Sequence, residues 1–164
     1  MGFSRPPHTG VKRALFRMPI WIYRLGLGGL LDGRFVLLTH IGRTSGQPRQ
    51  AVLEIVGRHE ESGGYLVASG YGSRSQWFRN ILREPRVRFQ VGWRHYTGTA
   101  RPLPAAESGR RLADYARRYP RTAASLMRIV GQDAGTTPAD YARVGADRDH
   151  GVPIVALCPD QRER

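Results

Sequence analysis

The chain has 164 residues, enough for one domain that buries its own hydrophobic core. Its formal net charge of +13 at pH 7 attracts anions of every kind, including nucleic acid, acidic membranes and anionic cofactors. A single cysteine, Cys158, excludes an intrachain disulfide, and no apolar run reaches the roughly 18 residues of a spanning helix. The N-terminus shows no secretory signal, so we expect a cytoplasmic protein.

The first 31 residues predict a separate N-terminal part. Residues 1–10 are typical of a flexible polar tail, and Lys12–Leu31 places apolar residues at helical spacing with arginines among them. A basic amphipathic helix of this kind can lie on the anionic inner face of the cell membrane. It can equally pack over a barrel mouth or against a second subunit. Residues 32–164 are expected to form the folded domain.

Short β-rich runs bounded by turn residues predict strands, and helical spacing predicts helices between and after them. In chain order the expected strands are Phe35–Ile41, Gln50–Arg58, Tyr65–Ser69, Val87–Val91, Trp93–Arg101 and Ile154–Leu157, and the expected helices are Gln76–Arg83, Pro104–Tyr119 and Thr122–Val130. The segment Gly131–Gly151 is polar and rich in turn residues and predicts no regular element. Successive hairpins with helices favour an α+β fold with an antiparallel sheet, whose exposed edges disappear if it closes into a barrel.

The segment Gly42–Arg49, GRTSGQPR, joins the first two predicted strands and is the strongest candidate for a binding site. Its two glycines can adopt positive φ and bring backbone N–H groups together in an anion-binding nest. Arg43 and Arg49 can fork onto phosphate oxygens, and Thr44 and Ser45 add hydroxyl donors. The spacing matches neither a Walker A loop nor G-x-G-x-x-G. On composition alone, an ordinary hairpin turn with surface arginines explains the segment equally well.

Three motifs in order give the segment a more specific meaning. The stretch THIGRTSGQPRQAVLEIV, the A-S-x-G pattern beginning at Ala68 and the W-F-x-N pattern at Trp77–Asn80 resemble the deazaflavin (coenzyme F420)-dependent nitroreductase and quinone-reductase family. The resemblance runs from about Phe35 to Pro159. It implies a split β-barrel and hydride transfer from F420H2 to a quinone, nitroaromatic or enone acceptor. Thr44 replaces a lysine of the family pattern, and His40 replaces a small hydroxyl residue.

The resemblance also implies where the cofactor binds. The implied cofactor-binding residues are Arg43, Thr44, Ser45, Arg49, Gln50, Ala51, Val52, Leu53, Glu54, Val67, Ala68, Ser69, Gly70, Gln76, Trp77, Phe78, Arg79 and Asn80. Ser69 is the first candidate for orienting the acceptor or donating a proton. Tyr71 and Tyr119 are further candidates, because a tyrosine can protonate a reduced quinone. Packing at a helix end is the alternative for Tyr119, and a place in the core is the alternative for Trp77.

Other functions have weaker support in the sequence. A non-catalytic split-barrel binder of a flavin, haem or fatty-acyl ligand is the main alternative, and FMN is the less favoured cofactor. Nucleic-acid binding has only the charge in its favour, because no aromatic-interleaved basic sheet or helix-turn-helix signature is present. The scattered histidines His8, His40, His59, His95 and His150 predict no metal site. The expected partner is a small-molecule hydride acceptor, and the sequence does not determine the oligomeric state.

Overall fold

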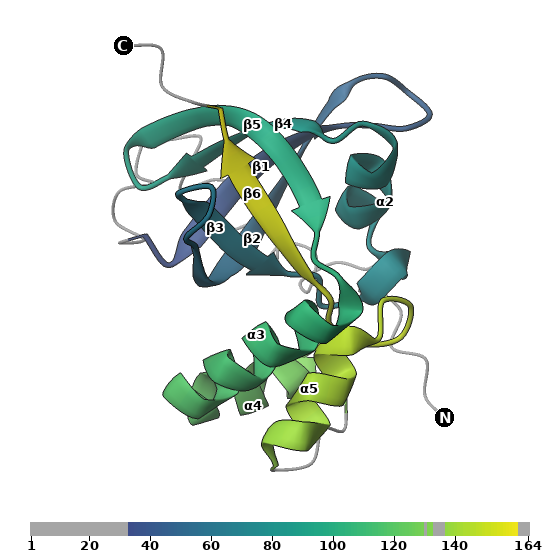
Figure 1. Ribbon diagram of the computed structural model, residues 1–164. Coiled ribbons are helices and arrows are strands. Elements are labelled where there is room, and N and C mark those ends of the chain that lie inside the picture. Colours follow the sequence, from purple (N-terminus) through teal and green to yellow (C-terminus); the bar gives the residue numbers. More distant parts are fainter. Residues whose placement is uncertain (1–32, 130, 133–136, 161–164) are drawn as a thin grey trace.

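In the computed structural model, which describes residues 33–129, 131–132 and 137–160, antiparallel strands close into a barrel with helices packed around it (Figure 1). The strands are β1 (Phe35–Ile41), β2 (Pro48–His59), β3 (Gly64–Ala68), β4 (Arg86–Val91), β5 (Arg94–Pro102) and β6 (Ile154–Pro159). Around the barrel they follow the order β1-β2-β3-β6-β5-β4. The predicted barrel is therefore confirmed. The predicted N-terminal tail and the helix over Lys12–Leu31 lie outside the described residues.

Three local hairpins and three distant pairings build the barrel together. The hairpins β1–β2, β2–β3 and β4–β5 join neighbours in sequence, whereas β1 pairs with β4, and β6 lies between β3 and β5. Alternate residues of the strands point inward and fill the barrel. Val36, Leu38, Val67 and Leu157 are completely buried there. This inward packing fixes the register of each strand.

The helix α2 (Gln76–Arg83), preceded by the short helix η2 (Gly72–Arg74), belongs to the same core. Its Trp77, Phe78 and Ile81 are buried among the inward side chains of the barrel. The bounds of α2 agree with the predicted helix. Figure 1 shows α2 at the right of the barrel, directly below the loop that joins β1 to β2.

Three further helices pack on the other side of the sheet and form a second core. They are α3 (Ala105–Arg118), α4 (Pro120–Ile129) and α5 (Pro138–Ala146). The prediction that Gly131–Gly151 holds no regular element is wrong, because α5 lies within it. Thr137 and Asp140 form a capping box that starts α5. Small residues then let α5 approach α3 closely: a Cβ on Gly109 would lie 2.4 Å from the Ala142 carbonyl oxygen.

Candidate cofactor-binding site

The loop Gly42–Arg49 turns tightly between β1 and β2. The Gly42 N–H donates to the Gln47 carbonyl at 2.9 Å, and the Gly46 N–H donates to the Gly42 carbonyl at 2.8 Å. Gly46 has a φ of 66°, which glycine adopts without strain. Gly42 is confined as well, since a Cβ there would lie 2.5 Å from the Ser45 hydroxyl oxygen. The backbone of the loop thus requires glycine at position 46, whereas a side chain at position 42 would require the Ser45 side chain to move.

Most of the loop's backbone donors are used within the protein, which makes the predicted anion nest small. The N–H groups of Gly42, Arg43, Gly46 and Gln47 all have protein acceptors. Thr44 and Ser45 are exposed, and their backbone N–H groups make no bond within the described part of the chain. Those two N–H groups, the Thr44 hydroxyl and the exposed Arg49 guanidinium remain open to a ligand.

Arg43 ties the loop to α2. Its backbone N–H donates to Asn80 Oδ1 at 3.1 Å, and its guanidinium Nη1 donates to the same oxygen at 2.9 Å. Nη1 also donates to Gln76 Oε1 at 2.9 Å. The guanidinium therefore has a fixed place at the junction of loop and helix, and its other N–H groups remain for an anion. Three residues of the implied binding set, Arg43, Gln76 and Asn80, are in this way brought into one contact.

His40 completes the contact from the barrel side. It shares the inward face of β1 with Val36 and Leu38, it is 3% exposed, and its Nδ1 lies 3.1 Å from Asn80 Nδ2. Burial, with a smaller contribution from the Arg49 charge, lowers the pKa of His40 from 6.5 to about 4. The imidazole is therefore neutral at pH 7.

The low pKa of His40 predicts a loss of stability in mild acid. Unfolding returns the pKa to 6.5, so between pH 6.5 and about 4 the unfolded chain binds more protons than the folded one. The contribution of neutral His40 to the free energy of unfolding should be fully present above pH 6.5. The free energy of unfolding should then fall by about 3 kcal/mol as the pH drops through that window. Denaturant unfolding at several pH values measures this. The His40→Asn protein has no titrating side chain at this position, so its free energy of unfolding should fall less steeply with decreasing pH. Parallel curves of unfolding free energy against pH for the two proteins would contradict the assignment of this loss to His40.

Ser69 holds the turn after β3. Its side chain is 0% exposed, its Oγ–H donates to the Gly72 carbonyl at 3.0 Å, and its N–H donates to the Pro153 carbonyl. In this conformation the hydroxyl is fully buried and bonded within the turn, so its predicted role in proton donation stays a prediction. Val67 is fully buried. Tyr71, beside this turn, is half-buried, and burial raises the pKa of its phenol.

The implied residues of β2 and α2 divide between core and surface. Ala51 and Leu53 pack into the barrel, and Trp77 and Phe78 meet edge to face at 5.9 Å within the same core. Because side chains alternate along a strand, Gln50, Val52 and Glu54 lie on the outer face of β2. Arg79 is exposed on α2. The structure thus places Trp77 in the core, as one of the two sequence interpretations expected.

A half-open groove of about 500 Å³ lies between α3 and the barrel end at which β1 begins. Its lining includes the apolar Ile55, Leu66 and Val91, the arginines Arg58, Arg111 and Arg118, and the tyrosines Tyr65, Tyr115 and Tyr119. Within this groove Tyr115 donates to Glu54 Oε1 at 2.8 Å, and burial together with Glu54 raises the Tyr115 pKa. The volume suits a small-molecule ligand.

Tyr119 lines the groove, whereas the other predicted catalytic residues, Ser69 and Tyr71, are not among its lining residues. Tyr119 is 56% exposed and its ring lies 5.6 Å from that of Tyr115. Tyr65 and Leu66, which line the groove, stand at the start of β3, whereas Ser69 follows its end. Four residues of extended strand span roughly 13 Å. Tyr119 therefore lies at the groove, whereas the buried Ser69 lies beyond the other end of β3.

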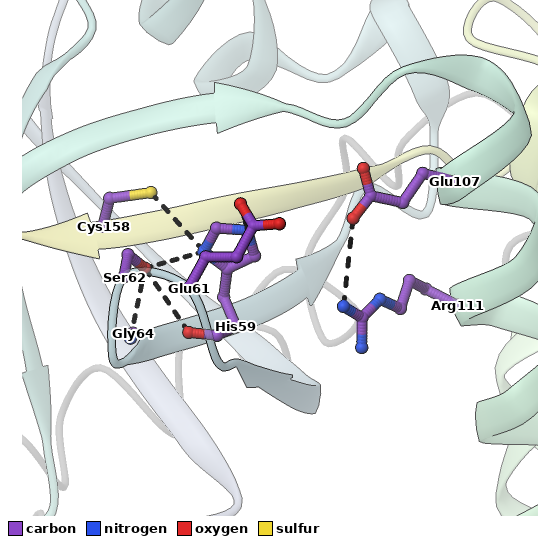
Figure 2. A network of polar contacts seen from close by, with 7 residues as sticks. All are labelled: His59, Glu61, Ser62, Gly64, Glu107, Arg111 and Cys158. Atoms are coloured by element: carbon purple, nitrogen blue, oxygen red, sulfur yellow. Dashed lines mark hydrogen bonds and ion pairs between the residues drawn. The ribbon is translucent and has the colours of Figure 1, made fainter.

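Figure 2 shows a polar network that the sequence did not indicate, where the β2–β3 turn meets β6. His59, 2% exposed, has its Nδ1 2.7 Å from Ser62 Oγ and 3.9 Å from Cys158 Sγ. Ser62 Oγ also accepts the Gly64 N–H at 3.2 Å. The network closes the turn, and Cys158 is half-buried beside it.

In the described ranges no group of His, Cys, Asp and Glu could hold a metal ion, and no helix is long and apolar enough to cross a membrane.

Solved structures with the same fold define the class of the molecule as a split β-barrel. The F420-H2 dependent reductase FDR-A superposes with a TM-score of 0.50 and 23% identity, over 76% of this chain and 93% of that one. The haem storage protein HutZ from Vibrio cholerae gives 0.52 at 14% identity, over 85% and 90%. A protein of unknown function from Agrobacterium tumefaciens gives 0.54 at 16% identity; the match covers 96% of this chain but only 60% of that protein's length. At these identities the likeness shows the fold alone.

The family is shown by a separate match. The model of the F420H(2)-dependent quinone reductase family matches residues 15–133, which is most of the chain. The chain belongs to this family of oxidoreductases. The resemblance drawn from the sequence motifs is thereby confirmed. No curated protein matches the chain.

Proposed function

We propose that the protein binds coenzyme F420 and passes a hydride from its reduced form to a quinone, nitroaromatic or enone acceptor. Family membership supports the cofactor. The observation that carries its placement is the loop Gly42–Arg49, where Arg43 is fixed on α2 while Thr44, Ser45 and Arg49 remain open. Coenzyme F420 carries a phosphodiester and a glutamate tail, and such anionic groups need several hydrogen-bond donors in one place. This loop offers guanidinium, hydroxyl and backbone N–H groups together.

The residues present fit such a ligand. Arg43 and Arg49 would neutralise the phosphate, and the net charge of +13 would attract the acidic tail from a distance. Gln50, Val52 and Glu54 form an outer strip of β2 that leads from the loop toward the groove. When bound, the reduced deazaflavin supplies the hydride. The chain's own groups bind and orient the reactants and exclude water.

The groove beside α3 is the proposed place of the acceptor. Its apolar residues suit a flat organic ring, and the exposed Tyr119 hydroxyl can give a proton to the oxygen or nitro-derived anion that forms when a hydride arrives. Tyr115 is bound to Glu54 and its pKa is raised, so it keeps its proton and holds the groove wall.

An acceptor assay tests this function. Purified protein should oxidise F420H2 in the presence of a soluble naphthoquinone, a nitroaromatic or an enone, as seen from the return of the oxidised cofactor's visible band. Binding of F420 without turnover on any of the three classes would favour a non-catalytic binder. A purified protein that carries a Soret or flavin spectrum and does not bind F420 would contradict the proposal.

A further inference from the structure

The orientation of the Asn80 side-chain amide can be deduced from its neighbours. Two groups of Arg43, the backbone N–H at 3.1 Å and Nη1 at 2.9 Å, approach the same atom of that amide. Both groups can only donate, so the atom that faces them must be the oxygen. The NH₂ group of Asn80 therefore points the opposite way, into the barrel end.

That orientation fixes the state of His40. Asn80 Nδ2 lies 3.1 Å from His40 Nδ1, and an NH₂ group can only donate. His40 Nδ1 must accept, so the imidazole is neutral and carries its proton on Nε2. His40 and Asn80 are 3% and 4% exposed, so the contact between them is largely shielded from bulk water.

We propose that His40 is a positioning residue of the cofactor loop: its Nδ1 holds the Asn80 amide, and Asn80 in turn holds the backbone and the guanidinium of Arg43. This deepens the function proposed above, on which the identity of the ligand rests. The chain of contacts runs from the barrel interior through α2 to the loop, and it links residues 37 and 40 positions apart in sequence. Without an acceptor at position 40, the amide loses one of the contacts that hold it in this orientation, and its buried NH₂ group is left without the His40 partner.

The variants His40→Leu and His40→Asn separate a positioning role from simple packing. Leucine fills much of the space without an acceptor, whereas the Oδ1 of asparagine stands close to the place of Nδ1. In the absence of cofactor, His40→Leu should speed hydrogen exchange of the Arg43 amide by about 10-fold or more, because its acceptor is no longer held. It should also weaken F420 binding by about 10-fold. His40→Asn should restore both toward the wild-type values.

Two further measurements test the positioning role of His40. In an Asn80→Ala background, His40→Leu should change neither quantity further, because the link between His40 and Arg43 is already absent. Nitrogen chemical shifts of the wild-type imidazole should report the Nε2–H tautomer at pH 7. An Nδ1–H tautomer, a folded His40→Leu protein with unchanged Arg43 exchange, or an undiminished effect in the Asn80→Ala background would each overturn it. If Arg43 exchange responds as expected but the wild type does not bind F420, the positioning role holds and the proposed function fails.

Discussion

Replacing Arg43 by alanine is expected to weaken F420 binding by about 10- to 100-fold, the range for one lost charge-assisted contact. The backbone N–H of residue 43 would still donate to Asn80, so the loop keeps its path and the loss reports the guanidinium itself. Affinity should also depend less on salt, since one of the cations that face the phosphate is gone. Fluorescence titration with F420 at several salt concentrations measures both effects.

Arg94→Ala is the matched control for this variant. It removes the same charge from an exposed residue at the turn between β4 and β5, which pairs with Val91 near the start of β1 and so lies at the other end of the barrel from the loop. The control should keep wild-type affinity to within about twofold. Equal affinities for Arg43→Ala and Arg94→Ala would remove the loop from the cofactor site.

A large loss of stability is expected from Gly98→Ala. A Cβ on this buried residue of β5 would lie 2.0 Å from the Cys158 carbonyl oxygen and 2.9 Å from the Pro159 Cα. Both are backbone atoms of β6, so no side-chain rotation relieves the clash. Because β6 closes the barrel between β3 and β5, we expect a loss of at least about 3 kcal/mol in the free energy of unfolding. Thermal and denaturant unfolding measure it.

Gly57→Ala provides the comparison within the same barrel. Its Cβ would meet only the Leu66 Cδ1 at 3.5 Å, an ordinary contact. We therefore expect a change within about 1 kcal/mol, since the methyl group fits and the unfolded chain loses some freedom. A Gly98→Ala protein as stable as Gly57→Ala would show that β6 does not approach β5 as closely as described.

The sequence predicted those parts of the fold that depend on local signals. Hairpin turns at Gly42–Arg49 and Gly92 and the helix ending before Pro85 were readable because a few neighbouring residues determine them. The place of β6 between β3 and β5 was not, because it depends on pairings far apart in the chain. The helix α5 was missed although Thr137, Pro138 and Asp140 give a start signal, since the residues that follow are small and carry little apolar periodicity.

The candidate site divides in the same way. The loop and its arginines could be proposed from composition and motif, because their chemistry lies within eight residues. That Arg43 rests on Asn80, and Asn80 on His40, needed the structure, since those contacts join β1, the loop and α2. The separation of Tyr119 from Ser69 also needed it. Both carry a hydroxyl group and were predicted to be catalytic, and only the fold shows that Tyr119 lines the groove while Ser69 is buried in a turn.

The most direct test of the central claim is a titration of the purified protein with F420, followed by quenching of the cofactor fluorescence. The wild type should bind with a Kd on the order of 10 µM or below, and affinity should fall in the Arg43→Ala and Arg49→Ala variants and as salt is raised. No binding by the wild type at several tens of micromolar (roughly a Kd above 100 µM) would contradict the account of this loop as a cofactor site.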